Sequence, residues 1–237
     1  MGYYNHEAQE HKVNTHPMCT ELPAFLPSAT ANNYCYRYLE ERKLDPDLAK
    51  ENGWFPSDNA GDEFLRIVIP AITHKAGHIY WQARDVSGAA YIRYQSPKGP
   101  RHEALVKVIP HYEPKGIVVV EGPMDALAAA GAGFIGYALM GMQPNKATLM
   151  HLALLIEDNS ELDVLVLLDR DSGPHDMKVS LFLASQGYHA VTGQLPGPEK
   201  DLAACLPSKR AKFLSKSFRY LSAYKSYPPP VPRGQNA

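Results

Sequence analysis

The sequence predicts an α/β fold: a parallel sheet with helices on both faces, preceded by a small α+β subdomain of helices and antiparallel strands. Residues 116–205 alternate short, wholly apolar runs with helical segments. A strand that is apolar on both sides needs helices on both faces of its sheet. Residues 64–97 instead hold short runs of β-branched and aromatic residues between glycine turns, which is typical of antiparallel strands.

The composition is that of a globular protein with an uneven charge distribution. At roughly 150 residues per domain, 237 residues correspond to about one and a half domains. The 45% of hydrophobic residues argues against a disordered chain. The net charge of -1 excludes a strongly basic, histone-like binder. Residues 202–237, however, hold seven Lys and Arg and no Asp or Glu, so an acidic body is followed by a basic tail.

Several other classes are excluded by what the sequence lacks. No apolar run reaches the roughly 18 residues of a membrane helix, so we expect no membrane partner. The N-terminus is polar and carries acids, unlike a signal peptide. The cysteines Cys19, Cys35 and Cys205 form no CxxC pair, so we expect neither a zinc site nor a disulfide framework, and a cytoplasmic location.

Five segments follow from proline, glycine and charge patterns. They are an irregular N-terminal segment 1–30, an α+β subdomain 31–112, a parallel-sheet domain 113–205, a basic helical extension 206–224 and a proline-rich disordered tail 225–237. In the subdomain we predict helices over 31–43 and from Asp45-Pro46 to Gly53, and strands over 64–72, 78–86 and 89–97.

The parallel-sheet domain alternates strands and helices. The predicted strands are 116–122, 134–141, 163–171 and 188–196, and the predicted helices are 124–130, 143–157, 177–186 and 201–218.

Acidic residues follow two of these strands. Glu121-Gly122 ends the first strand, with Asp125 in the turn after it, and Asp169 and Asp171 end the third. Ligands bind beyond the carboxyl ends of parallel strands, and residues i and i+2 of a strand point to the same side. Clustered carboxylates repel one another unless a cation neutralises them. Carboxylate oxygens suit Mg²⁺, so the pattern predicts a magnesium site that binds phosphates.

The same residues carry a resemblance to a known domain. V-V-V-E-G-P-M-D-A-L-A-A, followed by V-L-L-D-R-D, resembles the TOPRIM domain of bacterial-type DNA primases, topoisomerases and some nucleases. The resemblance covers about residues 113–205. It implies a TOPRIM sheet and phosphoryl-transfer chemistry with Mg²⁺ or Mn²⁺.

Upstream segments narrow the resemblance to the polymerase core of primases. The strands 67–70, 80–84 and 93–97 look similar to the region that precedes the TOPRIM domain there, and Tyr38 to Leu44, with Arg42, resembles a helix of such primases. Lys200-Asp201 resembles a later motif. Two departures are that Gly173 follows Asp171 by two residues rather than three, and that no zinc module precedes the core. The chain resembles minimal, phage-like primases.

The resemblance implies synthesis of short RNA primers on single-stranded DNA during DNA replication, by Mg²⁺-dependent transfer from ribonucleoside triphosphates. A replicative helicase is a possible partner, and a phage-encoded protein would work in the cytoplasm of its bacterial host. Asp169 and Asp171 would be metal ligands, and Glu121 a general base or a further ligand. Asp125 is either a ligand or a first-turn residue favoured by the helix dipole. Asp201 is a weaker candidate ligand.

A template strand needs positive charge and stacking surface. Six residues between 84 and 107 are predicted to supply it: Arg84, Arg93, Tyr94, Lys98, Arg101 and Lys107. The alternative for these residues is an ordinary solvated loop. The basic extension 206–224 is either a helix that grips the template backbone or a solvated helix.

Two other functions stay open. One is a TOPRIM nuclease that cleaves DNA or RNA with the same carboxylates. The other is a non-catalytic nucleic-acid-binding replication accessory.

Overall fold

The computed structural model of the chain describes residues 21–26, 28–58, 65–73, 79–99, 101–140, 143–170, 172 and 174–225. Most of the predicted irregular segment 1–30 and nearly all of the predicted tail 225–237 lie outside the described residues. So do Cys19, Asp171 and Gly173.

Nine strands of the described residues form one mixed sheet in the order β4-β3-β2-β5-β7-β6-β8-β9, with β1 also paired to β2. The strands are β1 Phe55–Ser57, β2 Arg66–Thr73, β3 Tyr80–Asp85, β4 Tyr94–Gln95, β5 Ala104–Val108, β6 Ile117–Val120, β7 Ile135–Ala138, β8 Val164–Val166 and β9 Ala190–Thr192. The pairs among β7, β6, β8 and β9 are parallel, and all other pairs are antiparallel.

Strand pairing runs across the boundary predicted near residue 112. β5 belongs to the amino-terminal half of the chain, yet it pairs with β2 on one side and β7 on the other. The antiparallel strands and the parallel strands are therefore parts of one sheet, and β5 fixes the position of one part against the other.

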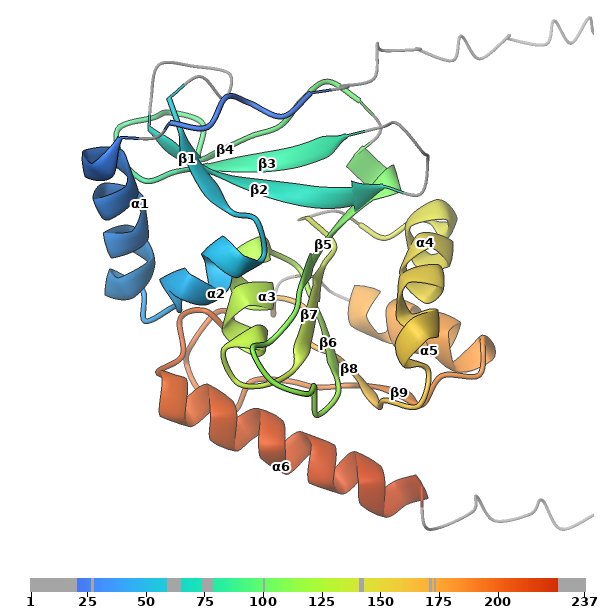
Figure 1. Ribbon diagram of the computed structural model, residues 1–237. Helices are drawn as coiled ribbons and strands as arrows, with labels where there is room; N and C mark the ends of the chain where they lie inside the picture. The colour runs from blue at the N-terminus through green and yellow to red at the C-terminus, as the bar shows by residue number, and fades with distance from the viewer. Residues whose placement is uncertain are drawn as a thin grey trace, which may run out of the picture.

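Helices cover the sheet on several sides (Figure 1). They are α1 Ala29–Glu41, α2 Pro46–Glu51, α3 Pro123–Ala130, α4 Lys146–Ile156, α5 His175–Ser185 and α6 Pro207–Lys225, with short 3₁₀ turns η1 Arg101–Glu103 and η2 Glu157–Asn159. Three of these helices have a polar N-cap residue: Ser28 for α1, Asp45 for α2 and Asn145 for α4. Each N-cap side chain accepts a hydrogen bond from a first-turn backbone N–H that has no partner within the helix.

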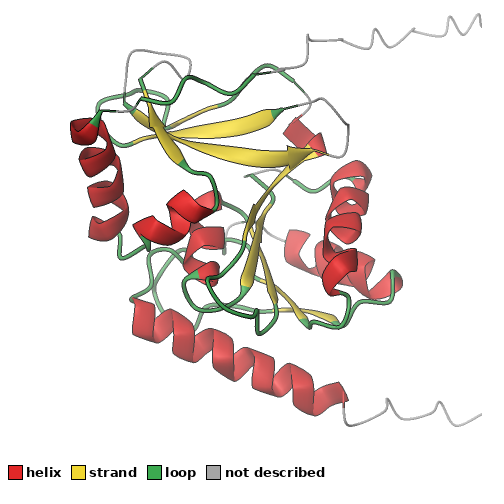
Figure 2. Cartoon of the chain, in the orientation of Figure 1, coloured by secondary structure: helices red, strands yellow, loops and turns green. Residues whose placement is uncertain are grey.

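The apolar strand β6 explains why helices lie on both faces of the parallel strands. Val118 and Val120 belong to one core with α3 and α6, whereas Ile117 and Val119 belong to a second core with α4 and α5. Side chains alternate between the faces of a strand, so a fully apolar run must be covered twice. Figure 2 shows helices on either side of the strands, and the predicted fold class is confirmed.

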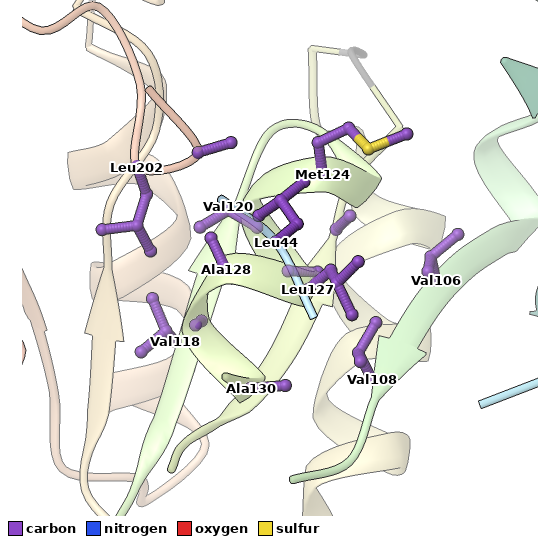
Figure 3. Close-up of a cluster of buried hydrophobic side chains, with 14 of the residues drawn as sticks. Leu44, Val106, Val108, Val118, Val120, Met124, Leu127, Ala128, Ala130 and Leu202 are labelled. Atoms are coloured by element: carbon purple, nitrogen blue, oxygen red, sulfur yellow. The ribbon is translucent and has the colours of Figure 1, made fainter. Parts of the chain in front are cut away.

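Helix α3 lies unusually close to the sheet. All eight of its residues are buried, and four of them are alanines. Figure 3 shows α3 with Met124, Leu127, Ala128 and Ala130 in the first core. Opposite it on β7 is Gly136, where an added Cβ would lie 2.3 Å from the carbonyl oxygen of Ala126. The absence of a side chain at Gly136 is what lets the helix approach the strand.

Five elements of the structure differ from the sequence-based predictions. β1 and β5 were not predicted, the strand predicted over 89–97 is reduced to β4, and the strand predicted over 188–196 is reduced to β9. The helix predicted from residue 201 begins at Pro207. Residues 201–205 form turns instead, in which Asp201 Oδ1 accepts the backbone N–H of Ala204 at 2.8 Å. Proline favours the first helical turn and disfavours helix in the residue before it.

Helix α6 packs across the strands through one apolar face. Leu214, Phe218 and Leu221 are buried, and the ring of Phe218 stacks on that of Phe134 with centroids 4.6 Å apart. Across the described part of the chain, no helix combines the length and apolar character needed to span a membrane.

Candidate active site

A cavity of about 340 Å³ lies beyond the carboxyl ends of β6 and β8, where the parallel strands meet the antiparallel ones. The side chains around it come from the residue after α1, from β3, from β4 and the residue before it, from η1, from the start of α3, and from the segments after β6, β7, β8 and β9. They are Arg42, Gln82, Arg84, Arg93, Tyr94, Arg101, Glu121, Pro123, Met124, Asp125, Met140, Asp169, Lys200, Asp201 and Ala203, together with Gly122.

Four carboxylates form what we call the acidic wall: Glu121, Asp125, Asp169 and Asp201. Ser172 Oγ donates to Glu121 Oε2 at 2.6 Å, and the Ala203 N–H donates to Asp125 Oδ1 at 2.8 Å. The second bond ties the first turn of α3 to the turns that follow Asp201. The Lys200 ammonium lies 3.6 Å from Asp169 Oδ2, so a cation already stands beside one of these carboxylates.

The same cavity is lined by a second group, which we call the basic wall: Arg42, Arg84, Arg93, Tyr94 and Arg101. Arg84 lies over the ring of Tyr94 at 4.9 Å from its centroid. Burial raises the pKa of Tyr94 to about 12, against the opposing charge of Arg84, so its phenol stays neutral at physiological pH.

The arginines of the basic wall differ in how they are held. The Arg84 Nε donates to Tyr38 Oη at 3.0 Å. Arg101 donates to the carbonyl oxygen of Met140. The Nε atoms of Arg42 and Arg101 are buried and have no hydrogen-bond partner among the described residues. Both atoms are donors on cavity-lining side chains.

The pKa of Asp125 is raised by its surroundings in the cavity. Burial raises the pKa of Asp125 to about 7, and the negative charges of Asp201 and Asp169 add to the rise. The hydrogen bond from Ala203 and the charge of Arg42 oppose it. The Asp125 carboxyl group is therefore half protonated at neutral pH, first because it is buried and second because the charges of Asp201 and Asp169 lie near it.

This acidic wall fits a hard, oxygen-binding cation by its chemistry. Its side-chain donors are carboxylate oxygens, the ligands that Mg²⁺ and Mn²⁺ take. The charges of Asp201 and Asp169 contribute, after burial, to the raised pKa of Asp125, and a bound cation would offset that contribution. Among the described residues, no three His, Cys, Asp or Glu side chains are close enough to form a complete metal site. Asp171 lies outside the described residues.

Most of the predicted site residues meet at this one cavity. Glu121, Asp125, Asp169 and Asp201 line it, as do Arg84, Arg93, Tyr94 and Arg101 of the predicted template-binding set. Lys98 does not line it. Lys107 lies elsewhere, because its ammonium is 5.7 Å from the centroid of the Tyr137 ring on the neighbouring strand β7.

Sequence reasoning missed Arg42 and Gln82 as cavity residues. Arg42 follows the end of α1 and stands in the Tyr38-to-Leu44 motif, which was the available signal. Gln82 is 3% exposed on β3, whose six residues are all buried or half-buried. A buried amide within such a strand needs hydrogen-bond partners, and that need was the signal for it.

The raised pKa of Asp125 predicts a pH-dependent stability. A folded pKa of about 7 against an ordinary 3.8 gives stability that is fully present below pH 3.8 and lost as the pH rises through 7. Asn at this position keeps an acceptor for the Ala203 N–H but cannot ionise. We expect the free energy of unfolding of Asp125→Asn, relative to the unmodified protein, to rise between pH 5 and pH 8.5 by on the order of a few kcal/mol. Urea denaturation of both proteins at the two pH values measures this difference. The same difference in free energy of unfolding at pH 5 and pH 8.5 would refute the prediction.

Comparison with known proteins identifies the fold. No protein-family model and no curated protein sequence matches the chain. The Aquifex aeolicus primase, solved as its zinc-binding and RNA polymerase domains, matches with a TM-score of 0.56 and 22% identity over 78% of this chain. The match covers 55% of the Aquifex chain, so the present chain spans about half of it.

Two further solved structures match over most of both chains. The RNA polymerase domain of Mycobacterium tuberculosis primase, in complex with double-stranded DNA, has a TM-score of 0.52 and 20% identity over 82% of this chain and 78% of that one. A DNA primase domain from Pseudomonas aeruginosa has a TM-score of 0.51 and 19% identity over 86% and 83%. The resemblance found in the sequence is thus confirmed at the level of structure: the chain has the fold of the RNA polymerase core of bacterial DNA primases.

Proposed function

We propose that the chain is a DNA primase-like nucleotidyltransferase that synthesises short RNA primers on single-stranded DNA. The observation that carries this proposal is that the acidic wall and the basic wall line one cavity of about 340 Å³. Phosphoryl transfer needs both: carboxylates to hold a divalent cation, and cationic donors to bind phosphates. The primase-core fold supports the same reading.

In this proposal Glu121 and Asp169 hold Mg²⁺ or Mn²⁺, with Asp171, Asp125 and Asp201 as further candidate ligands. When bound, the cation neutralises charge on the triphosphate. The oxygen of a 3′-hydroxyl attacks the α-phosphorus of a ribonucleoside triphosphate, and the bond to pyrophosphate breaks. Glu121 is placed to accept the hydroxyl proton if it is not itself a ligand. Its bond from Ser172, 2.6 Å long, orients the carboxylate.

The basic wall would bind the negatively charged partners of the reaction. Arginine forms paired hydrogen bonds with phosphate oxygens, and Arg42 and Arg101 each have a buried donor with no partner among the described residues. Arg84 over the Tyr94 ring offers a charged and an aromatic surface together, which suits a single strand of template. Template DNA and ribonucleoside triphosphates are the proposed ligands, and a replicative helicase is the proposed partner during replication in a phage-infected or bacterial cytoplasm.

The test is to incubate the protein with single-stranded DNA, Mg²⁺ and labelled ribonucleoside triphosphates, and to resolve the products by length. The proposal predicts short labelled RNA that requires both template and divalent cation. Shortened DNA without labelled RNA would identify a nuclease instead. DNA binding without either product would identify a non-catalytic accessory.

A further inference from the structure

Helix α6 carries a row of cations on the side opposite its packed face. Lys209, Lys212, Lys216 and Arg219 are all exposed and spaced at i, i+3, i+7 and i+10, which places them on one face of the helix. We call these four residues the α6 stripe. No residue of α6 is acidic, so no carboxylate within the helix neutralises the stripe.

Aromatic surface lies alongside these cations. Two hollows, of about 600 and 400 Å³, separate α6 from residues 189–199, and Phe213 and Tyr220 line both. Tyr220 is 60% exposed, and the ammonium of Lys216 is 5.8 Å from the centroid of its ring. Cations for phosphates next to exposed rings for bases are the two components of single-strand binding surfaces.

The α6 stripe begins beside the cavity. Lys209 pairs with Glu199 at 3.2 Å, next to the cavity residue Lys200. The following residue, Arg210, is buried and donates to the carbonyl oxygen of Lys43, which follows Arg42 of the basic wall. From there the stripe rises along about 15 Å of helix, the length of roughly four nucleotides at 3.4 Å each.

We infer that the α6 stripe is a second binding surface for single-stranded nucleic acid, which receives the strand where it leaves the cavity. The inference rests on the proposed function for the presence of a strand in the cavity. Continuity with the cavity and the exposed Tyr220 ring favour a nucleic acid over an acidic protein, because an acidic protein would need only the positive charge. In Figure 1, α6 lies along the lower edge of the molecule, beneath the sheet.

Fluorescence anisotropy with labelled dT₂₅ tests the inference without requiring catalysis. The test variant is Lys212→Gln/Lys216→Gln/Arg219→Gln, and the charge-matched control is Arg37→Gln/Lys50→Gln/Lys146→Gln, whose three cations are exposed on other helices. Binding is measured between 50 and 200 mM salt. Three lost phosphate contacts lower the salt slope by about 2. Over that range the unmodified protein should therefore lose roughly 20-fold more affinity for dT₂₅ than the test variant does.

The control should keep the salt slope of the unmodified protein. Equal slopes for the test variant and the control would overturn the inference. So would displacement of dT₂₅ by polyglutamate at equal charge concentration. If primer synthesis is absent while the slopes differ as expected, the proposed function fails and the binding surface stands. If primer synthesis occurs but the slopes are equal, the proposed function stands and the α6 stripe is not a binding surface.

Discussion

Asp169→Asn is expected to lower the rate of template-directed RNA synthesis by about 10²–10³-fold and to leave the fold intact. Asp169 lies after the end of β8, lines the cavity and is paired with Lys200 at 3.6 Å. Its replacement removes a negative charge that contributes, after burial and the charge of Asp201, to the raised pKa of Asp125. The negative charge of Asp169 helps to attract a divalent cation. The variant should therefore lose catalysis and remain folded. Glu121→Gln should behave in the same way.

The matched control is Glu113→Gln, which neutralises an exposed acid on the loop before β6 and should keep full activity. The rate of primer synthesis at saturating ribonucleotides and the far-ultraviolet circular dichroism spectrum are measured for each variant. Full activity in both Asp169→Asn and Glu121→Gln would remove the acidic wall from the reaction.

Gly136→Ala is expected to destabilise the protein by about 3 kcal/mol or more. The new Cβ would stand 2.3 Å from the carbonyl oxygen and 2.7 Å from the Cα of Ala126. Both atoms belong to the backbone of α3, so no side-chain rotation relieves the overlap. Helix and strand must move apart, which opens the core between α3 and β6 (Figure 3). Since Glu121 and Asp125 flank the start of α3, the cavity should be distorted as well.

Gly99→Ala is the control, because an added Cβ there meets only Tyr80 Cε2 at 3.9 Å. Urea denaturation of the two variants and the unmodified protein gives the free energies of unfolding. A Gly136→Ala protein as stable as Gly99→Ala would show that α3 can retreat without cost.

The features predicted from sequence are those that local pattern determines. The apolar run of β6 needs cover on both faces wherever it lies, so it predicts the layered architecture. The carboxyl ends of parallel strands share one edge, so Glu121 and Asp169 were expected to meet, and both line the cavity.

The features that could not be predicted from the sequence depend on contacts between distant segments. β5 has only five residues, and its role follows from its two partners β2 and β7, which no local pattern specifies. Lys107 was grouped with the template-binding arginines by proximity in sequence, but its position on β5 directs it to Tyr137. Arg42 reaches the cavity because α1 ends there, which requires knowing how α1 packs against β1 and α2.

The proposed chemistry depends on a divalent cation at the ends of β6 and β8, and iron-mediated cleavage locates such a cation without requiring template recognition. Fe²⁺ is substituted for Mg²⁺ in the full chain, ascorbate and peroxide generate hydroxyl radicals at the bound ion, and the protein fragments are identified by mass spectrometry. We predict backbone cleavage near Glu121 and near Asp169, suppressed by excess Mg²⁺ and lost in Asp169→Asn. Cleavage confined to other segments, or unchanged in that variant, would contradict the assignment of the cation site.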